Sequence, residues 1–136
     1  MTFPEKLDVL TVHATLIAET GGTHGLRDEA LLESALAAAE YRHRYEAADA
    51  VKCAATYAYH VTQTHAFLDG NKRVAAAITE AFLETNGFEL IMTNDEIVVL
   101  FLAIASSEVT RDQVEQRPRE KVERRTKTRT LLEANR

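Results

Sequence analysis

The residues of this chain that could carry out chemistry are gathered in nine consecutive positions, 65–73, between two alanine-rich segments. They comprise a histidine, an aspartate, a glycine-asparagine turn and two cations: His65, Asp69, Gly70, Asn71, Lys72 and Arg73. Histidine is well suited to accept a proton near neutral pH, and a carboxylate is a preferred ligand of Mg²⁺. These residue types together indicate a site that handles phosphate and has its own general base.

The elements on either side must place this stretch at the start of a helix. Apolar spacing predicts helices over 47–64 and 71–86, with the polar stretch as the turn between them. The second helix would begin near Gly70 or Asn71, so its free N–H groups and the positive end of its dipole would face the two cations. Such a helix N-terminus is a binding site for phosphate.

Each of these residues also has an ordinary structural explanation. His65 could simply end a helix, and Asp69 could serve only as the N-cap of the next one. The remaining four could be a common turn dipeptide followed by a solvated pair of charges. However, cations in the first turn of a helix oppose the helix dipole, so two of them at this place favour a bound anion.

The stretch resembles the signature of the Fic/Doc superfamily, H-P-F-x-[D/E]-G-N-x-R, in the variant with lysine after asparagine that belongs to the Doc (death-on-curing) branch. The matching positions are His65, Phe67, Asp69, Gly70, Asn71, Lys72 and Arg73, and Ala66 stands where the family has proline. The loop 21–28 and the helix after it are also similar to the Doc branch. The resemblance implies the Fic fold, an all-α helical bundle with the active-site loop between two core helices.

The resemblance also implies a role for each site residue. His65 would be the general base and Asp69 the ligand of Mg²⁺, while the backbone at Gly70 would approach the phosphates closely. Asn71 would brace the loop, and the two cations after it would contact the phosphates of ATP. Segment 40–46 is the expected counterpart of the flap that aligns the target chain in this family.

Two departures from the larger Fic family imply phosphoryl transfer rather than AMP transfer. Lys72 stands where Fic proteins have a glycine that leaves room for a diphosphate, and Ala76 replaces a second phosphate-binding arginine. In the Doc branch the nucleotide is reversed and presents its γ-phosphate. The resemblance therefore implies a Doc-like toxin that phosphorylates a translation factor such as elongation factor Tu and is paired with a small Phd-like antitoxin.

Two other functions stay open at this point. One is transfer of AMP or another nucleotidyl group, as in most Fic proteins. The other is a non-catalytic module that binds a phosphorylated ligand or an antitoxin. Ala66 in place of proline favours this second alternative, because the rigidity of the loop would differ.

The composition is that of an ordinary globular domain, with 46% hydrophobic and 27% charged residues among 136. No apolar run approaches the ~20 residues of a membrane span, and the N-terminus lacks the apolar region of a signal peptide. Cys53 is the only cysteine, so an internal disulfide is excluded. These points favour the cytoplasm and predict no membrane partner.

Charge is unevenly spread along the chain. Residues 1–110 hold 7 Lys/Arg against 16 Asp/Glu, a net charge of −9, whereas residues 111–136 hold 9 against 5, a net charge of +4. An acidic body disfavours general nucleic-acid binding, while the basic end could touch an acidic partner or the body itself. We therefore divide the chain into a helical domain, 1–110, and a basic C-terminal helix or tail, 111–136.

The other elements follow from spacing and capping signals. Further helices are predicted over 4–20 (Leu7, Leu10, Ala14 and Ile17 inward), over 29–39 after an Asp28 N-cap, over 94–107 from the capping box Thr93-x-x-Glu96, and from Thr110-x-x-Gln113 until Pro118 interrupts it. The best strand candidate is 88–92. Residues 119–136 are predicted to be a charged helix or disordered. His13 and the three other histidines outside the motif lack metal-ligand spacing and are expected to be structural.

Overall fold

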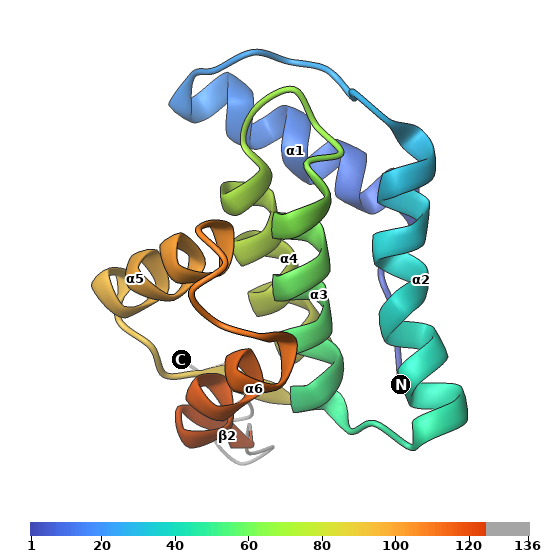
Figure 1. The fold of residues 1–136 in the computed structure, drawn as a ribbon, viewed down its shortest axis with the longest axis vertical. Helices are drawn as coiled ribbons and strands as arrows, with labels where there is room; N and C mark the ends of the chain where they lie inside the picture. Colours follow the sequence, from blue (N-terminus) through green and yellow to red (C-terminus); the bar gives the residue numbers. More distant parts are fainter. Residues whose placement is uncertain (125–136) are drawn as a thin grey trace, which may run out of the picture.

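The protein is helical apart from one short β-ribbon, in a computed structural model that describes residues 1–124 (Figure 1). The elements in chain order are α1 (Lys6–Thr20), α2 (Glu29–Glu46), α3 (Ala50–Thr64), α4 (Asn71–Thr85), β1 (Phe88–Leu90), α5 (Asn94–Ala105), α6 (Arg111–Glu120) and β2 (Val122–Arg124). The prediction of an all-α fold is confirmed. Among the described residues, no helix has both the length and the apolar character needed to cross a membrane.

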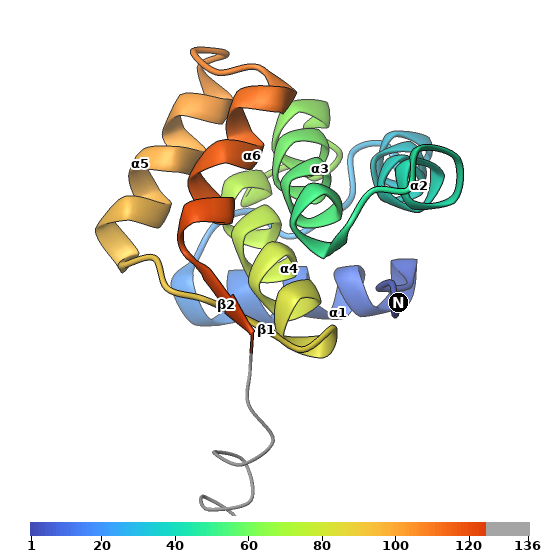
Figure 2. The same ribbon diagram turned by 90° about the horizontal axis from the view of Figure 1, so that it is seen from below.

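Helix α3 lies at the centre of the molecule, with α2 and α6 on either side and α4 alongside (Figures 1 and 2). Three of its alanines, Ala54, Ala55 and Ala58, are completely buried. Small side chains let the neighbouring helices approach closely, so α3 is held by many short van der Waals contacts. Helix α1 packs against α4. The loop between α3 and α4 is therefore carried by well-buried helices.

Helix α2 continues through the segment that the sequence predicted to be a flap. The inward stripe of α2 extends beyond Ala39 to Arg42, which is buried although it is charged. The Arg42 guanidinium donates a hydrogen bond from Nη1 to Thr56 Oγ1 of α3 at 2.9 Å. This contact keeps the chain helical as far as Glu46, so the segment 40–46 is part of a helix; its expected role as the flap that aligns a target chain stays a prediction.

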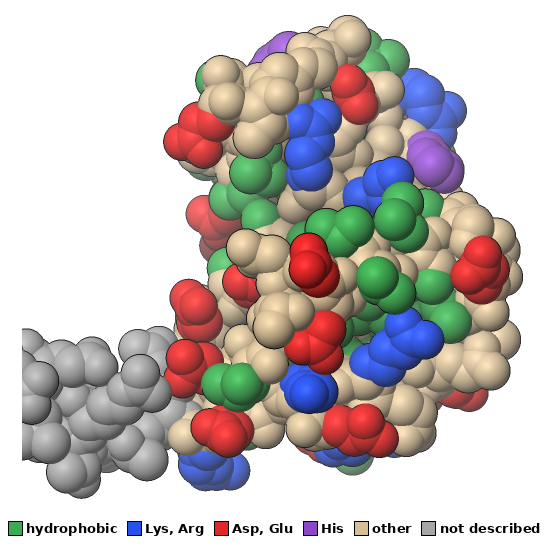
Figure 3. All heavy atoms as spheres, turned by 90° about the vertical axis from the view of Figure 1, so that its left-hand side faces the viewer, with side chains coloured by type: hydrophobic (Ala, Val, Ile, Leu, Met, Phe, Trp, Pro, Cys, Tyr) green, Lys and Arg blue, Asp and Glu red, His purple; other side chains and the backbone are tan. Residues whose placement is uncertain are grey.

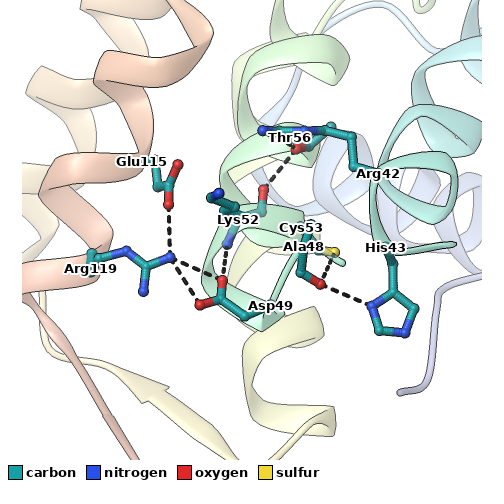
Figure 4. A network of polar contacts seen from close by, with 9 residues as sticks. All are labelled: Arg42, His43, Ala48, Asp49, Lys52, Cys53, Thr56, Glu115 and Arg119. Atoms are coloured by element: carbon teal, nitrogen blue, oxygen red, sulfur yellow. Dashed lines mark hydrogen bonds and ion pairs between the residues drawn. The ribbon is translucent and has the colours of Figure 1, made fainter. Parts of the chain in front are cut away.

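Helix α3 begins at Ala50, three residues later than predicted, because Asp49 caps it. Asp49 Oδ1 accepts a hydrogen bond from the Lys52 N–H at 2.9 Å, and both carboxylate oxygens accept from Arg119 of α6 at 3.0 and 3.1 Å (Figure 4). Arg119 also donates to Glu115 at 2.7 Å. The Arg119 guanidinium is the main reason that the pKa of Asp49 lies below its usual value. The N-terminal end of α3 is thus tied to α6.

Cys53 and His43 tie the same end of α3 to α2. The Cys53 thiol is completely buried and approaches the carbonyl oxygens of Ala39 and Ala48 at 3.7 and 3.8 Å. Burial raises the pKa of Cys53 to about 11, so this thiol stays protonated and serves as a core residue, as predicted. His43 Nδ1 donates to the same Ala48 carbonyl at 2.9 Å.

The C-terminal part differs from its prediction in two ways. Pro118 lies inside α6, which continues to Glu120; the proline lacks the N–H that would bond to the Val114 carbonyl, but its ring is buried, which offsets that loss. Strand β2 then pairs antiparallel with β1, the predicted strand candidate, with Leu90 opposite Val122. The prediction of a charged helix or of disorder is therefore wrong for residues 121–124. The rest of that prediction, 125–136, lies outside the described residues.

Helices α5 and α6 begin with the capping boxes that the sequence predicts. Thr93 and Glu96 exchange side-chain to backbone hydrogen bonds at the start of α5, and Thr110 and Gln113 do the same at the start of α6. The outer side of α5 exposes more than half of each of three apolar side chains, Val98, Val99 and Leu102. Figure 3 shows this face, where apolar side chains lie among charges of both signs.

Candidate active site

The predicted site stretch forms the turn between α3 and α4. His65 ends α3 in the left-handed region, with φ 50° and ψ 46°, which is uncommon for a residue with a side chain. Gly70 is the N-cap of α4, with φ 78°, and the helix starts at Asn71. Asp69 is therefore not the N-cap, contrary to the ordinary explanation considered for it. Its carboxylate is left for other contacts.

The loop before α2 holds this turn from outside. Leu26 pairs with Phe67 in a short antiparallel bridge, in which the Arg27 N–H donates to the Ala66 carbonyl at 2.7 Å. The Arg27 side chain donates from Nε to the His65 carbonyl at 2.7 Å and so occupies the end of α3. Arg27 thus joins the loop before α2 to the turn. In the structure it also fixes the backbone of the candidate general base.

Asn71 braces the turn from inside. Its Oδ1 accepts from the Phe67 N–H and its Nδ2 donates to the Phe67 carbonyl, both at 3.0 Å. Phe67 is 2% exposed and Ala66 is fully buried, so water does not replace these bonds. A single amide side chain thereby satisfies both backbone groups of a buried residue.

Asp69 points its carboxylate toward three donors. Oδ2 accepts from the Thr23 N–H at 3.1 Å, Oδ1 accepts from the Gly70 N–H at 2.8 Å, and the Arg73 guanidinium lies 3.6 Å from Oδ1. The two backbone N–H groups, followed by Arg73, hold the pKa of Asp69 below its usual value, so the group is ionised at neutral pH. A side chain at Gly22 would lie 2.6 Å from Asp69 Oδ2, so only glycine permits this approach.

The two predicted phosphate-binding cations have different surroundings. Arg73 donates from Nη1 to Thr20 Oγ1 and to the Gly21 carbonyl, the latter at 2.8 Å, so its head group is partly committed to the end of α1. Lys72 is exposed and pairs with no residue in the described part of the chain. Lys72 is thus the freer of the two charges.

A cavity of about 450 Å³ opens over the turn. Its lining consists of Thr62, His65, Leu68, Asp69, Gly70, Asn71, Lys72, Arg73 and Ala105. All six predicted site residues are therefore brought to one cavity, at the N-terminus of α4. An exposed imidazole, an ionised carboxylate, a free ammonium and unpaired helix N–H groups face a common space, which is an arrangement suited to a phosphate-bearing ligand.

His13 is a site residue that the sequence reasoning treated as structural. It lies on α1, is 2% exposed, and stacks on Phe67 with ring centroids 3.8 Å apart. Its Nε2 is 2.7 Å from the Asp69 carbonyl oxygen, which can only accept, so Nε2 carries the proton. Val9, His13 and Ile17 are the buried positions of α1, whereas the predicted inward residue Leu7 is 70% exposed. The i, i+4 spacing of Val9, His13 and Ile17 was the sequence signal that could have indicated that His13 faces the interior.

Asp69 is the carboxylate that could hold a divalent cation. Within residues 1–124, no group of three or more His, Cys, Asp or Glu side chains is placed to bind a metal by itself. Mg²⁺ is commonly held by one or two carboxylates, with phosphate and water oxygens completing the set. An ionised and partly exposed carboxylate in a cavity suited to phosphate fits that requirement.

Comparison with known proteins identifies the family of this chain. Residues 4–83 match the family model described as the Fic/DOC family. The match covers more than half of the chain and includes α1, the loop that holds the turn, the turn itself and most of α4. No curated protein matches the chain.

Proposed function

Because this chain belongs to the Fic/DOC family, whose members are generally transferases, we propose that it transfers the γ-phosphate of ATP to a hydroxyl of a protein. The observation that carries this proposal is Lys72, which lines the cavity beside the helix N-terminus and pairs with no residue within 1–124. A lysine fills the room that a diphosphate would need there. Ala76, where a second arginine would serve AMP transfer, supports the same choice.

The residues of the turn would have separate roles in such a reaction. The attacking hydroxyl oxygen forms a bond to the γ-phosphorus, its proton passes to His65, and the bond to the bridging oxygen breaks so that ADP leaves. Lys72, Arg73 and the first N–H groups of α4 offset the negative charge of the phosphates. Phosphoryl transfer asks a protein mainly for positioning and charge neutralisation, which the contacts of this turn can supply.

Asp69 would hold the Mg²⁺ that accompanies ATP. When bound, the cation would neutralise charge on the phosphate oxygens. The Asp69 carboxylate is kept ionised and in place by the Thr23 and Gly70 N–H groups. Asn71 keeps the backbone of the turn fixed through Phe67.

The biological setting is proposed from the resemblance to the Doc branch. The protein would act as a toxin of a toxin–antitoxin pair in the cytoplasm. Its target would be a translation factor such as elongation factor Tu, and a Phd-like antitoxin would restrain it. The net charge of −9 over residues 1–110 suits a basic segment of such an antitoxin.

A paired labelling experiment tests the proposed reaction. The purified protein is incubated with Mg²⁺, bacterial lysate and ATP labelled at either the γ- or the α-phosphate. His65→Ala is compared with His24→Ala, a matched control that removes another exposed histidine outside the cavity lining. We expect protein labelling from the γ-phosphate only, lowered about 10²- to 10⁴-fold by His65→Ala and unchanged by His24→Ala.

The other outcomes identify the alternatives. Labelling from the α-phosphate would mean nucleotidyl transfer and would overturn the interpretation of Lys72. Nucleotide binding without labelling, also with purified elongation factor Tu as substrate, would point to a binding module.

A further inference from the structure

His13 and the carboxylate of Asp69 are joined through a single peptide group. His13 Nε2 donates to the Asp69 carbonyl oxygen at 2.7 Å, on one side of the peptide that links Asp69 to Gly70. The N–H of that same peptide donates to Asp69 Oδ1 at 2.8 Å. The imidazole and the carboxylate are therefore connected by two hydrogen bonds in series.

The geometry of the peptide makes the second bond depend on the first. A trans peptide points its C=O and its N–H in opposite directions, so fixing the oxygen on His13 also fixes the direction of the Gly70 N–H. The peptide would otherwise be easy to rotate, because Gly70 has φ 78° and glycine tolerates both halves of the φ range. His13 therefore removes a freedom that the glycine introduces.

His13 is itself held rigidly. Its ring is 2% exposed and lies nearly parallel to the Phe67 ring, with an angle of 14° between the planes. Phe67 is in turn bound at both backbone groups by Asn71. A Cβ at Gly70 would lie 3.5 Å from His13 Nε2, so the imidazole also packs closely on the peptide that it binds.

We propose that His13 is a positioning residue, which holds the Asp69–Gly70 peptide so that its N–H orients the Asp69 carboxylate toward the cavity. This inference rests on the proposed function in one respect, which is the role of Asp69 toward Mg²⁺. His13 does not line the cavity and takes no part in proton transfer. Its effect passes through the backbone, in the way that outer groups orient metal ligands.

Two substitutions separate positioning from packing. His13→Phe keeps an aromatic ring against Phe67 but removes the donor, whereas His13→Gln keeps a donor amide but removes the ring. The matched control is His43→Phe, because His43 also donates a ring N–H to a buried backbone carbonyl, that of Ala48 at 2.9 Å. That contact lies at the opposite end of α3 (Figure 4).

Two readouts are measured on each variant. The first needs no ligand: the proton shift and hydrogen exchange of the Gly70 amide by ¹⁵N NMR. We expect His13→Phe to move this amide toward solvent-exposed values and to speed its exchange, and His13→Gln to restore it. The second is the Mg²⁺ concentration for half-maximal transfer, which we expect to rise about tenfold or more in His13→Phe and to stay near the wild-type value in His13→Gln.

Three results would overturn the inference. One is an unchanged Gly70 amide in a folded His13→Phe protein, whatever its stability. Another is a Mg²⁺ requirement that shifts equally in His43→Phe, because the effect would then be general destabilisation. The third is a folded His13→Gln protein that behaves as His13→Phe. If the wild-type protein transfers no phosphate, the proposed function fails, but the Gly70 amide still decides whether His13 orients this peptide.

Discussion

At its N-terminal end α3 is anchored by paired charges, whereas at its C-terminal end two polar side chains, those of His65 and Thr62, have no such partner among the described residues. Asp49 binds Arg119 and the start of the helix, and Arg119 binds Glu115 as well. At the other end, His65 is exposed in a left-handed conformation. The buried hydroxyl of Thr62 there has no hydrogen-bond partner among the described residues.

The two ends of α3 therefore have different roles: the N-terminal end contributes mainly to stability, and the C-terminal end belongs to the candidate active site. An unpaired buried hydroxyl costs about 1–3 kcal/mol, and a left-handed residue with a side chain adds strain of about 1–3 kcal/mol. The fold accepts both costs beside the cavity. The end near Asp49 also has a left-handed residue, Ala47 with φ 54°, but there the charges of Asp49 and Arg119 are paired. The buried alanines of α3 keep the two ends in a fixed relation, so the anchored end steadies the strained one.

The largest effect on stability is expected when the brace of the turn is removed. Asn71→Ala leaves the N–H and the carbonyl of buried Phe67 without partners, which should lower the free energy of unfolding by about 2–4 kcal/mol. Asp49→Ala at the other end removes a helix cap and an exposed ion pair, for a loss of about 1–2 kcal/mol. Urea unfolding measures both. An equal or larger loss in Asp49→Ala would mean that the turn is not held by Asn71.

A smaller change in stability is expected when either of two buried threonines of α3 is replaced, and the two replacements should differ. Thr56→Val removes the acceptor of the buried Arg42 guanidinium and should cost about 1–3 kcal/mol. Thr62→Val removes a hydroxyl that has no hydrogen-bond partner within residues 1–124, so the stability should stay the same or rise slightly. Thermal unfolding of the two variants checks this. A marked loss in Thr62→Val would show that its hydroxyl has a bound partner in solution.

The smallest effect is expected from acid, because Asp49 and Asp69 are both partly exposed and solvent screens their contacts. The folded state lowers both pKa values, so each carboxylate contributes stability at pH values above about 4, and this contribution is lost as the pH falls through the lower folded value. Asp49→Asn and Asp69→Asn should therefore each lose less stability than the wild type between about pH 5 and pH 2. Urea midpoints at several pH values, without Mg²⁺, provide the measurement. Curves parallel to the wild type would contradict it.

Local features of the chain were predictable from its sequence. The capping boxes at Thr93 and Thr110 lie within four residues of chain, and so does the turn from Asp69 into α4. The six predicted site residues all line the cavity because they are consecutive or nearly so, and a turn between two helices brings such residues together.

Features that depend on distant partners were not predictable in this way. The length of α2 is set by Arg42 reaching Thr56, and Pro118 is tolerated because its ring is buried. The contact of His13 with Asp69 spans 56 positions, and that of Thr23 with Asp69 spans 46. No local spacing rule contains such information, since it arises only when α1 packs against α4.

These long-range contacts affect the order in which the site can form during synthesis and folding. A fragment beginning at residue 29 would contain the whole nine-residue signature and would lack His13, Thr23 and Arg27. Synthesis proceeds from the N-terminus, so α1 and the loop after it exist before the signature is made. The residues of α1 and of the following loop are therefore already present when the turn is made. A nascent chain cannot complete the site until α4 has emerged and docked on α1.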